Sequence, residues 1–195
     1  MVISAQLIKD LREKTGAGVS DVKKALEESG GDMARALIII ERKLGSVSEK
    51  KIGRETKAGI VDAYIHSNGR IGALVELFCE TDFVARNPVF KELAHDIALQ
   101  VAAMRPLYGS FDVIPPDVWE AEKSRFTIEA QTLNKPSAII AEIIDGKLKA
   151  YFGTVTLLEQ SFVKDQNKAL KDIINEAIGR FGENIKVGRF VRLEF

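Results

Sequence analysis

The sequence predicts an α+β fold, in which an N-terminal three-helix module precedes a core with a small antiparallel sheet packed with helices. Three observations predict this fold. Apolar residues at helical spacing, interrupted by glycines, fill residues 1–45, a strand-turn-strand pattern begins at residue 58, and residues 185–195 again have strand character. We therefore expect a helical module over 1–45, a linker over 46–57 and an α+β core over 58–195.

The composition excludes several classes of protein. The 28 Lys and Arg residues balance the 28 Asp and Glu residues, so the chain lacks the basic excess of proteins that bind nucleic acid through its phosphates. One cysteine, Cys79, rules out an intramolecular disulfide, and the two histidines, His66 and His95, have no metal-ligand spacing, so we expect surface roles for them. No signal-peptide pattern or membrane-length apolar run occurs. We expect a cytoplasmic protein without a membrane or direct nucleic-acid partner.

Three short helices are predicted in the N-terminal module. Ser4 is the expected N-cap of the first, which ends near Gly16. Ser20 is the expected cap of the second and Asp32 that of the third, which Gly45 should close. In residues 46–57 apolar residues no longer recur at helical spacing, and the segment contains four Lys or Arg residues and two Glu residues. This composition is typical of a solvated connector, and the alternative is a segment that contacts a partner.

A β-hairpin is predicted over residues 60–78, with Asn68-Gly69 as a two-residue loop in which both residues need positive φ. Alternation places apolar side chains on both faces. One face carries Ile60, Tyr64, Ile71, Val75 and Leu77, and the other carries Val61, Ile65, Leu74 and Phe78. Because only one face can pack on helices, the other needs a cover from the chain itself or from a second subunit.

The rest of the core is predicted to contain four helices and a final strand. Asn87 and Pro88 begin a helix that ends before Arg105-Pro106, and prolines also mark the starts of helices over 116–133 and from 136 onward. A further helix is predicted over 165–181. The strand at 185–195 should return to pair with the hairpin, with Gly188 at a bulge.

Motifs for catalysis are absent from the sequence. It contains no phosphate-binding loop and no Gly-x-Ser-x-Gly elbow, and Gly16-Ala17-Gly18 lacks the third glycine and preceding strand of a dinucleotide site. Glu76, Glu80 and Asp82 are the candidates for a general acid and base, but carboxylates near the end of a strand are more often solvated than catalytic. We therefore expect no catalytic residue, no cofactor and no metal site.

Residues 79–87, between the hairpin and the next helix, have an unusual composition for a surface connection, because Phe83 and Val84 follow Thr81 and Asp82. In one interpretation Phe83 folds back into the core and Thr81 or Asp82 forms a turn. In the other, a rigid loop presents an aromatic ring, a carboxylate and a hydroxyl to a partner, which is the mixture expected of an interface anchor.

The run Thr81-Asp82-Phe83-Val84 closely resembles the signature of translation elongation factor Ts. Further matching blocks lie at 11–18, 21–26, 30–32, 158–165 and 182–187, so the resemblance covers almost the whole chain. Ser161 stands where the family often has proline, and Val22 where a cysteine is common. With its end at Phe195, the chain resembles the short, single-core-subdomain form of the family.

The resemblance implies a guanine nucleotide exchange factor that binds elongation factor Tu in its GDP-bound and nucleotide-free states. Carried over to this sequence, Thr81, Asp82, Phe83 and Val84 intrude near the partner's Mg²⁺ site, displace the ion and promote exchange of GDP for GTP, with Phe83 as a wedge. Residues 1–45 correspond to a module similar to ubiquitin-associated domains, here called UBA-like, that docks on the nucleotide-binding domain. Two chains are expected to form a homodimer.

Two other functions are compatible with the residues alone. The first is a nucleic-acid or ribosome-binding module built from the N-terminal helices and the basic linker, which a steep salt dependence of RNA binding would favour. The second is an enzyme that uses Cys79 and a histidine, which loss of activity on thiol alkylation would favour.

Overall fold

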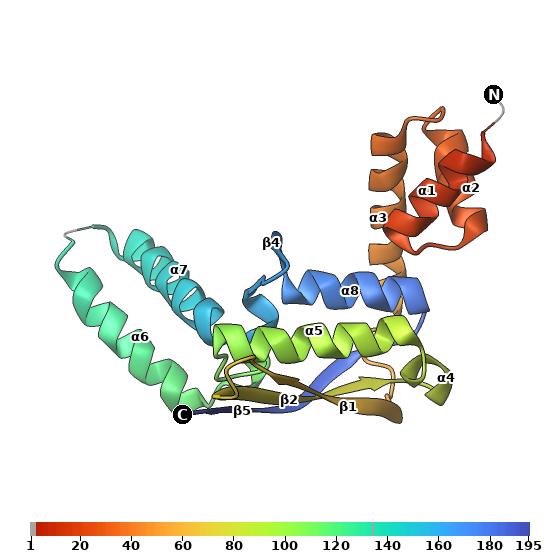
Figure 1. Ribbon diagram of the computed structural model, residues 1–195. Helices are drawn as coiled ribbons and strands as arrows, with labels where there is room; N and C mark the ends of the chain where they lie inside the picture. Colours follow the sequence, from red (N-terminus) through yellow and green to blue (C-terminus); the bar gives the residue numbers. More distant parts are fainter. Residues whose placement is uncertain (1–2, 134) are drawn as a thin grey trace. The chain divides into compact units, whose positions relative to one another are not determined.

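The computed structural model describes residues 3–133 and 135–195 and has the predicted α+β composition (Figure 1). The chain divides into two compact units. The first unit comprises the chain up to Ile60 together with Leu77–Lys91 and Asp172–Lys186, and the second comprises Val61–Glu76, Glu92–Lys171 and Val187–Phe195. The expected separation into a module, a linker and a core concerns independent folding, and it stays a prediction.

Three helices begin the first unit: α1 (Ala5–Thr15), α2 (Val19–Glu28) and α3 (Met33–Lys51). Two of the three predicted caps are confirmed, because Ser4 accepts a hydrogen bond from the Leu7 amide and Asp32 accepts from two amides of the first turn of α3. The buried side chains of the three helices and of the turn between α1 and α2 form one cluster that consists of Leu11, Ala17, Val22, Ala25, Leu26, Ala36 and Ile40. The prediction for the cap of α2 was wrong, since Gly18 occupies that position and Ser20 lies inside the helix.

The helix α3 continues through Gly45, where the sequence predicted its end. Its last turns pack against α8 (Leu170–Phe181) in the same unit. Ser48 is 2% exposed, and its hydroxyl donates a hydrogen bond of 3.1 Å to the Asn175 side chain. These tertiary contacts outweigh the low helix propensity of one glycine, so the helical part of the chain extends six residues into the predicted linker.

Three strands form an antiparallel sheet in the order β1-β2-β5, where β1 is Ala58–Ile65, β2 is Ile71–Cys79 and β5 is Lys186–Glu194. The hairpin and the returning C-terminal strand are thereby confirmed. The loop differs from the prediction of a two-residue turn. The His66 amide donates to the Ile71 carbonyl, so four residues form the loop, and of Asn68 and Gly69 only Gly69 has positive φ.

The side chain of Asn68 accounts for this difference in the hairpin loop. Its oxygen accepts a hydrogen bond of 2.9 Å from the Arg70 amide, and the Gly69 amide donates to the His66 carbonyl. Such local side-chain bonds give the backbone an alternative to the tightest hairpin turn.

The two faces of the sheet differ in burial as the alternation predicts. Figure 1 shows α5 (Pro88–Met104) along one face, where within the second unit Val75 is 1% exposed and Ile97 is fully buried. The opposite face, here called the apolar sheet face, carries exposed hydrophobic side chains, namely Val61, Ile65, Leu74, Val191 and Leu193. No described part of the chain buries them.

The second unit also contains the helices α6 (Pro116–Gln131) and α7 (Ser137–Val155), which pack on each other around Phe126, Leu148 and Phe152. Two short 3-10 helices, η1 (Phe111–Val113) and η2 (Leu157–Glu159), flank this pair. The predicted end of α6 is two residues too late. The sequence also predicts a break at Asn134-Lys135-Pro136. Lys135 and Pro136 do lie between the two helices, and Asn134 lies outside the described residues.

The helix predicted over 165–181 begins only at Leu170. Residues Asp165–Ala169 instead form β4, which pairs with β3 (Ser161–Phe162). The Asp165 side chain accepts a hydrogen bond from the Asn167 amide, a local bond that competes with helix formation. The Leu170 amide then donates to the Gln160 carbonyl where the helix starts.

Candidate partner-binding site

The predicted interface segment folds as a single helical turn, α4 (Asp82–Ala85), between β2 and α5. Its four residues do not share one environment. Phe83 is 84% exposed, whereas Val84 is 4% exposed and Ala85 is 5% exposed. The interpretation in which Phe83 folds back into the core is therefore wrong, because the ring points away from the packed interior and Val84 takes the inward position.

The structure brings Thr81, Asp82 and Phe83 together on the exposed side of this turn. Thr81 is the N-cap, as a short polar residue before a helix should be, and its hydroxyl oxygen lies 3.5 Å from the Val84 amide. Asn87 then begins α5, with its side chain accepting a hydrogen bond of 2.9 Å from the Val89 amide, as predicted. Of the four predicted residues, Val84 is placed to anchor the turn and the other three are accessible.

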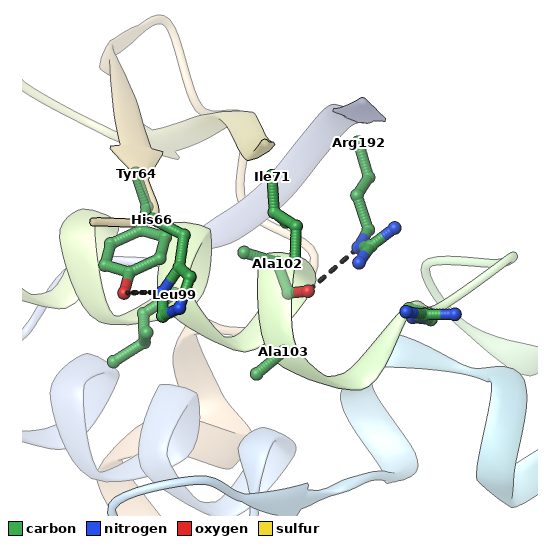
Figure 2. Close-up of a pocket in the computed structure, with 8 residues that line it drawn as sticks. Tyr64, His66, Ile71, Leu99, Ala102, Ala103 and Arg192 are labelled. Atoms are coloured by element: carbon green, nitrogen blue, oxygen red, sulfur yellow. Dashed lines mark hydrogen bonds between the residues drawn. The ribbon is translucent and has the colours of Figure 1, made fainter. Parts of the chain in front are cut away.

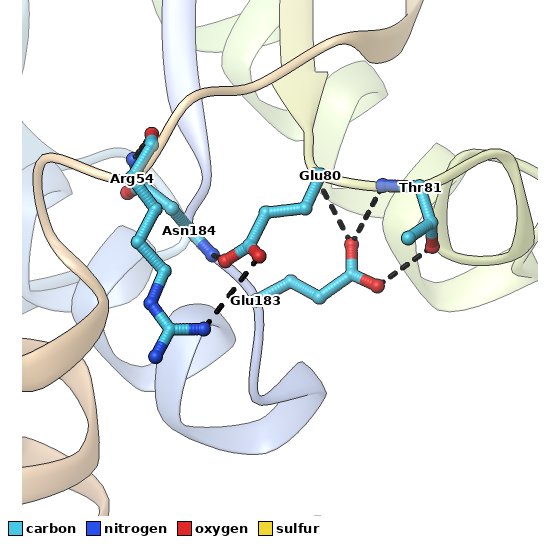
Figure 3. A network of polar contacts seen from close by, with 5 residues as sticks. All are labelled: Arg54, Glu80, Thr81, Glu183 and Asn184. Atoms are coloured by element: carbon cyan, nitrogen blue, oxygen red, sulfur yellow. Dashed lines mark hydrogen bonds and ion pairs between the residues drawn. The ribbon is translucent and has the colours of Figure 1, made fainter.

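A polar network that sequence reasoning missed holds the start of α4 (Figure 3). The Glu183 carboxylate accepts hydrogen bonds from the Glu80 amide at 3.1 Å, the Thr81 amide at 3.0 Å and the Thr81 hydroxyl at 2.6 Å. In return, the Asn184 amide donates to the Glu80 carboxylate at 2.7 Å, while the Arg54 guanidinium lies 3.8 Å from the same carboxylate. The one signal in the sequence was the block at 182–187, in which Glu183 lies.

Cys79 is fully buried at the end of β2, and its thiol donates a hydrogen bond of 3.3 Å to the Thr81 carbonyl. Burial raises the pKa of this thiol above its usual value, and the negative charge of Glu183 adds to the shift. A buried thiol with a raised pKa is a poor nucleophile. The geometry thus gives no support to an enzyme that uses Cys79.

Two of the three carboxylates considered for catalysis, Glu76 and Glu80, are engaged in structural contacts, whereas the third, Asp82, is exposed. Glu76 forms an ion pair with Arg189 across the sheet, and the hydrogen bond from Arg189 lowers the pKa of that carboxyl below its usual range. Glu80 belongs to the network around Glu183. Among the described residues, no group of three or more His, Cys, Asp or Glu side chains is arranged to hold a metal ion.

A small cavity of about 210 Å³ lies in the second unit between the sheet and α5 (Figure 2). The Tyr64 hydroxyl lies 3.1 Å from Nδ1 of His66, and the Arg192 guanidinium donates to the Ala102 carbonyl at 2.8 Å. His95, on α5, lies 3.2 Å from the Asp62 carboxylate. The cavity is smaller than typical ligand pockets, and these polar groups satisfy one another.

Of the helices in the described part of the chain, none combines the length and the apolar character that a bilayer span requires. The ring of Phe83, which is 84% exposed on a short helix, is suited to contact with another macromolecule.

Comparison with known proteins agrees with the geometry. The family model described as elongation factor TS matches residues 40–195. Proteins named elongation factor Ts from Thermotoga petrophila, Coprothermobacter proteolyticus and Thermodesulfovibrio yellowstonii are 54%, 50% and 48% identical to this chain. The three alignments cover 100%, 98% and 100% of this chain and 96%, 98% and 96% of the relatives. The chain belongs to the elongation factor Ts family of translation elongation factors.

Proposed function

We propose that this chain is a guanine nucleotide exchange factor that binds elongation factor Tu in its GDP-bound form. It displaces Mg²⁺, promotes release of GDP and leaves a nucleotide-free complex into which GTP binds. The observation that carries the proposal is the 84% exposure of Phe83 on a turn whose other side is packed. The chemistry belongs to the partner, so the chain itself needs no catalytic group and no cofactor.

The energetics require more than one contact. An exchange factor releases GDP only by binding the nucleotide-free partner more tightly than the loaded one, and each tenfold in release corresponds to about 1.4 kcal/mol of that difference. Burial of one Phe side chain contributes about 1.5–3 kcal/mol. Phe83 therefore accounts for one to two decades, and Asp82 beside it brings a negative charge that competes for the Mg²⁺ ion. The UBA-like module over residues 1–45 supplies further docking contacts.

The proposal includes a homodimer in the cytoplasm. The apolar sheet face leaves Val61 at 65% and Leu193 at 66% exposed, and a contiguous apolar patch of this kind marks an interaction surface. A second copy of the chain offers the same apolar surface and can pack sheet against sheet.

The test replaces Phe83 and Asp82 with alanine and follows release of a fluorescent GDP from elongation factor Tu by stopped flow. We expect release at least about tenfold slower than with the wild-type chain, because the Phe83 burial is lost. Both side chains are exposed, so the unfolding temperature should not change. Ile128→Ala on α6, which removes a side chain that is 69% exposed, is the matched control.

An unchanged release rate for the double variant would contradict the proposal. If that result came with RNA binding that weakens steeply with salt, a nucleic-acid-binding module would be the better interpretation.

A further inference from the structure

We propose that Glu183 is a positioning residue for Phe83. Its carboxylate fixes the junction between β2 and α4 and thereby holds the turn in the orientation that presents the ring. The inference rests on the proposed exchange function and adds to it a residue that lies 102 positions from Thr81 in the sequence and that we do not place in contact with the partner.

A single helical turn needs support from outside itself. Isolated helices of this length are unstable in water, because the first turn fixes several residues for one hydrogen bond. The internal cap is weak here, since the Thr81 hydroxyl oxygen is 3.5 Å from the Val84 amide. Phe83 buries almost nothing within the chain. The direction of its ring is therefore set by the packing of Val84 and by whatever holds the start of the turn.

Glu183 holds that start with both of its oxygens. Oε2 accepts from the Glu80 and Thr81 amides, and Oε1 accepts from the Thr81 hydroxyl. Hydrogen bonds to an ionised carboxylate are stronger than those between neutral groups. With the Cys79 thiol on its carbonyl, Thr81 has its amide, hydroxyl and carbonyl all engaged. Thr81, which directly precedes Asp82 and Phe83, is thus held by hydrogen bonds at its amide, its hydroxyl and its carbonyl.

Glu183 is itself held in position by the end of the helix that precedes it. The helix α8 ends at Phe181, and the next residue, Gly182, has a φ of 68° in the left-handed region and an amide that donates to the Ile178 carbonyl at 2.9 Å. The preceding Phe181 packs edge-on against Phe90 of α5, with ring centroids 6.0 Å apart. The chain reverses directly after this anchored end, so the Glu183 side chain reaches the junction from a fixed position.

Removal of the Glu183 carboxylate should slow nucleotide exchange although no residue that contacts the partner is replaced. Glu183→Ala removes both acceptor oxygens and with them all three hydrogen bonds, so only a fraction of molecules will hold α4 in the presenting orientation, and we expect GDP release about tenfold slower. Glu183→Gln should restore much of this loss. Its oxygen can accept from the two amides while its amide group donates to the Thr81 hydroxyl.

The decisive experiment is a double-mutant cycle in the stopped-flow assay with Phe83→Ala, Glu183→Ala and the combined variant. If Glu183 acts by placing Phe83, its substitution has no further effect once the ring is gone, and the combined variant is as slow as Phe83→Ala alone. Hydrogen exchange of the full-length protein should quicken at the Glu80 and Thr81 amides in Glu183→Ala. Glu142→Ala, at an exposed position of α7, is the control for loss of a carboxylate.

The outcomes separate the inference from the function on which it rests. Two results would overturn the positioning role and leave the exchange function intact, provided that Phe83→Ala is slow. In the first, Glu183→Ala is as fast as wild type; in the second, the effects of the two substitutions multiply fully in the combined variant. A Phe83→Ala variant as fast as wild type overturns both. If Glu183→Ala does not fold, Thr81→Val takes its place in the cycle. It removes one of the three hydrogen bonds to Glu183 together with the long cap to the Val84 amide, and we expect a loss of about threefold.

Discussion

Adjacent side chains in α4 lie in opposite surroundings: Phe83 is almost fully exposed and Val84 is buried. A single exposed aromatic residue is common on soluble proteins and by itself carries no functional meaning. The role that we propose for Phe83 rests on the constraint beneath it, because Val84 is buried under the turn and Glu183 accepts hydrogen bonds from Thr81, the residue that caps it. A ring presented on a fixed backbone loses little conformational entropy when it binds, so more of its burial energy appears as affinity.

At the same scale, Cys79 should be inert to thiol reagents in the folded protein. It is fully buried, and burial raises the pKa of its thiol, so the thiolate that reacts is scarcer than in a free cysteine at pH 7 to 8. We expect alkylation by iodoacetamide to be far slower than in urea, as measured by mass spectrometry. Rapid stoichiometric labelling of the native chain, with loss of exchange activity, would contradict this assignment.

At the scale of elements, the contact between α3 and α8 explains why α3 is longer than predicted. A Cβ atom at Gly179 would lie 2.8 Å from the Cβ and carbonyl oxygen of Leu44, which is closer than real Cβ atoms approach other atoms. The two helices of the first unit therefore meet where α8 has no side chain. Gly45, one residue beyond Leu44, has open space around it and no such role.

Substitution of the two glycines should change stability in opposite directions. Gly179→Ala forces the helices apart and should lower the free energy of unfolding by about 1–3 kcal/mol. Gly45→Ala improves helix propensity at an open position and should raise it by about 0.5–1 kcal/mol. Urea unfolding followed by circular dichroism measures both. Equal destabilisation by both substitutions would show that the contact at Gly179 is not tight.

Elements with local determinants could be predicted from the sequence. The caps at Ser4, Asp32 and Asn87 and the hairpin follow from residues within a few positions of each other. The errors lie where distant contacts or side-chain bonds decide the backbone, as for α3, which continues past its predicted end at Gly45, and for the strand at 165–169, where a helix was predicted.

The candidate site was likewise predictable from the sequence only in part. The sequence singled out Thr81–Val84 but could not determine which apolar side chain faces outward, because either can do so in a single turn. The position of Glu183 depends on how α8 packs, and nothing near Thr81 in the sequence indicates it.

At the scale of the whole molecule, the apolar sheet face is the largest feature that the chain alone leaves unexplained. Val61, Ile65 and Leu74 from the hairpin lie on it with side chains of β5, and each is at least 47% exposed. The ion pair between Glu76 and Arg189 borders the same surface. Apolar residues with a charged pair among them are typical of an interface between folded proteins, whereas a solvated sheet face alternates with polar residues.

We therefore expect the chain to be a dimer at micromolar concentration, with a light-scattering mass twice the 21.5 kDa of one chain. Val61→Glu combined with Leu74→Glu should reduce that mass to one chain, because four carboxylates would be buried in a symmetric interface without partners. Ile128→Glu, at an exposed position of α6, should leave the mass unchanged. A wild-type mass of one chain would exclude the dimer without bearing on Phe83, because the apolar sheet face and α4 consist of different residues. Exchange measured with the monomeric variant then shows whether one chain is sufficient to release GDP.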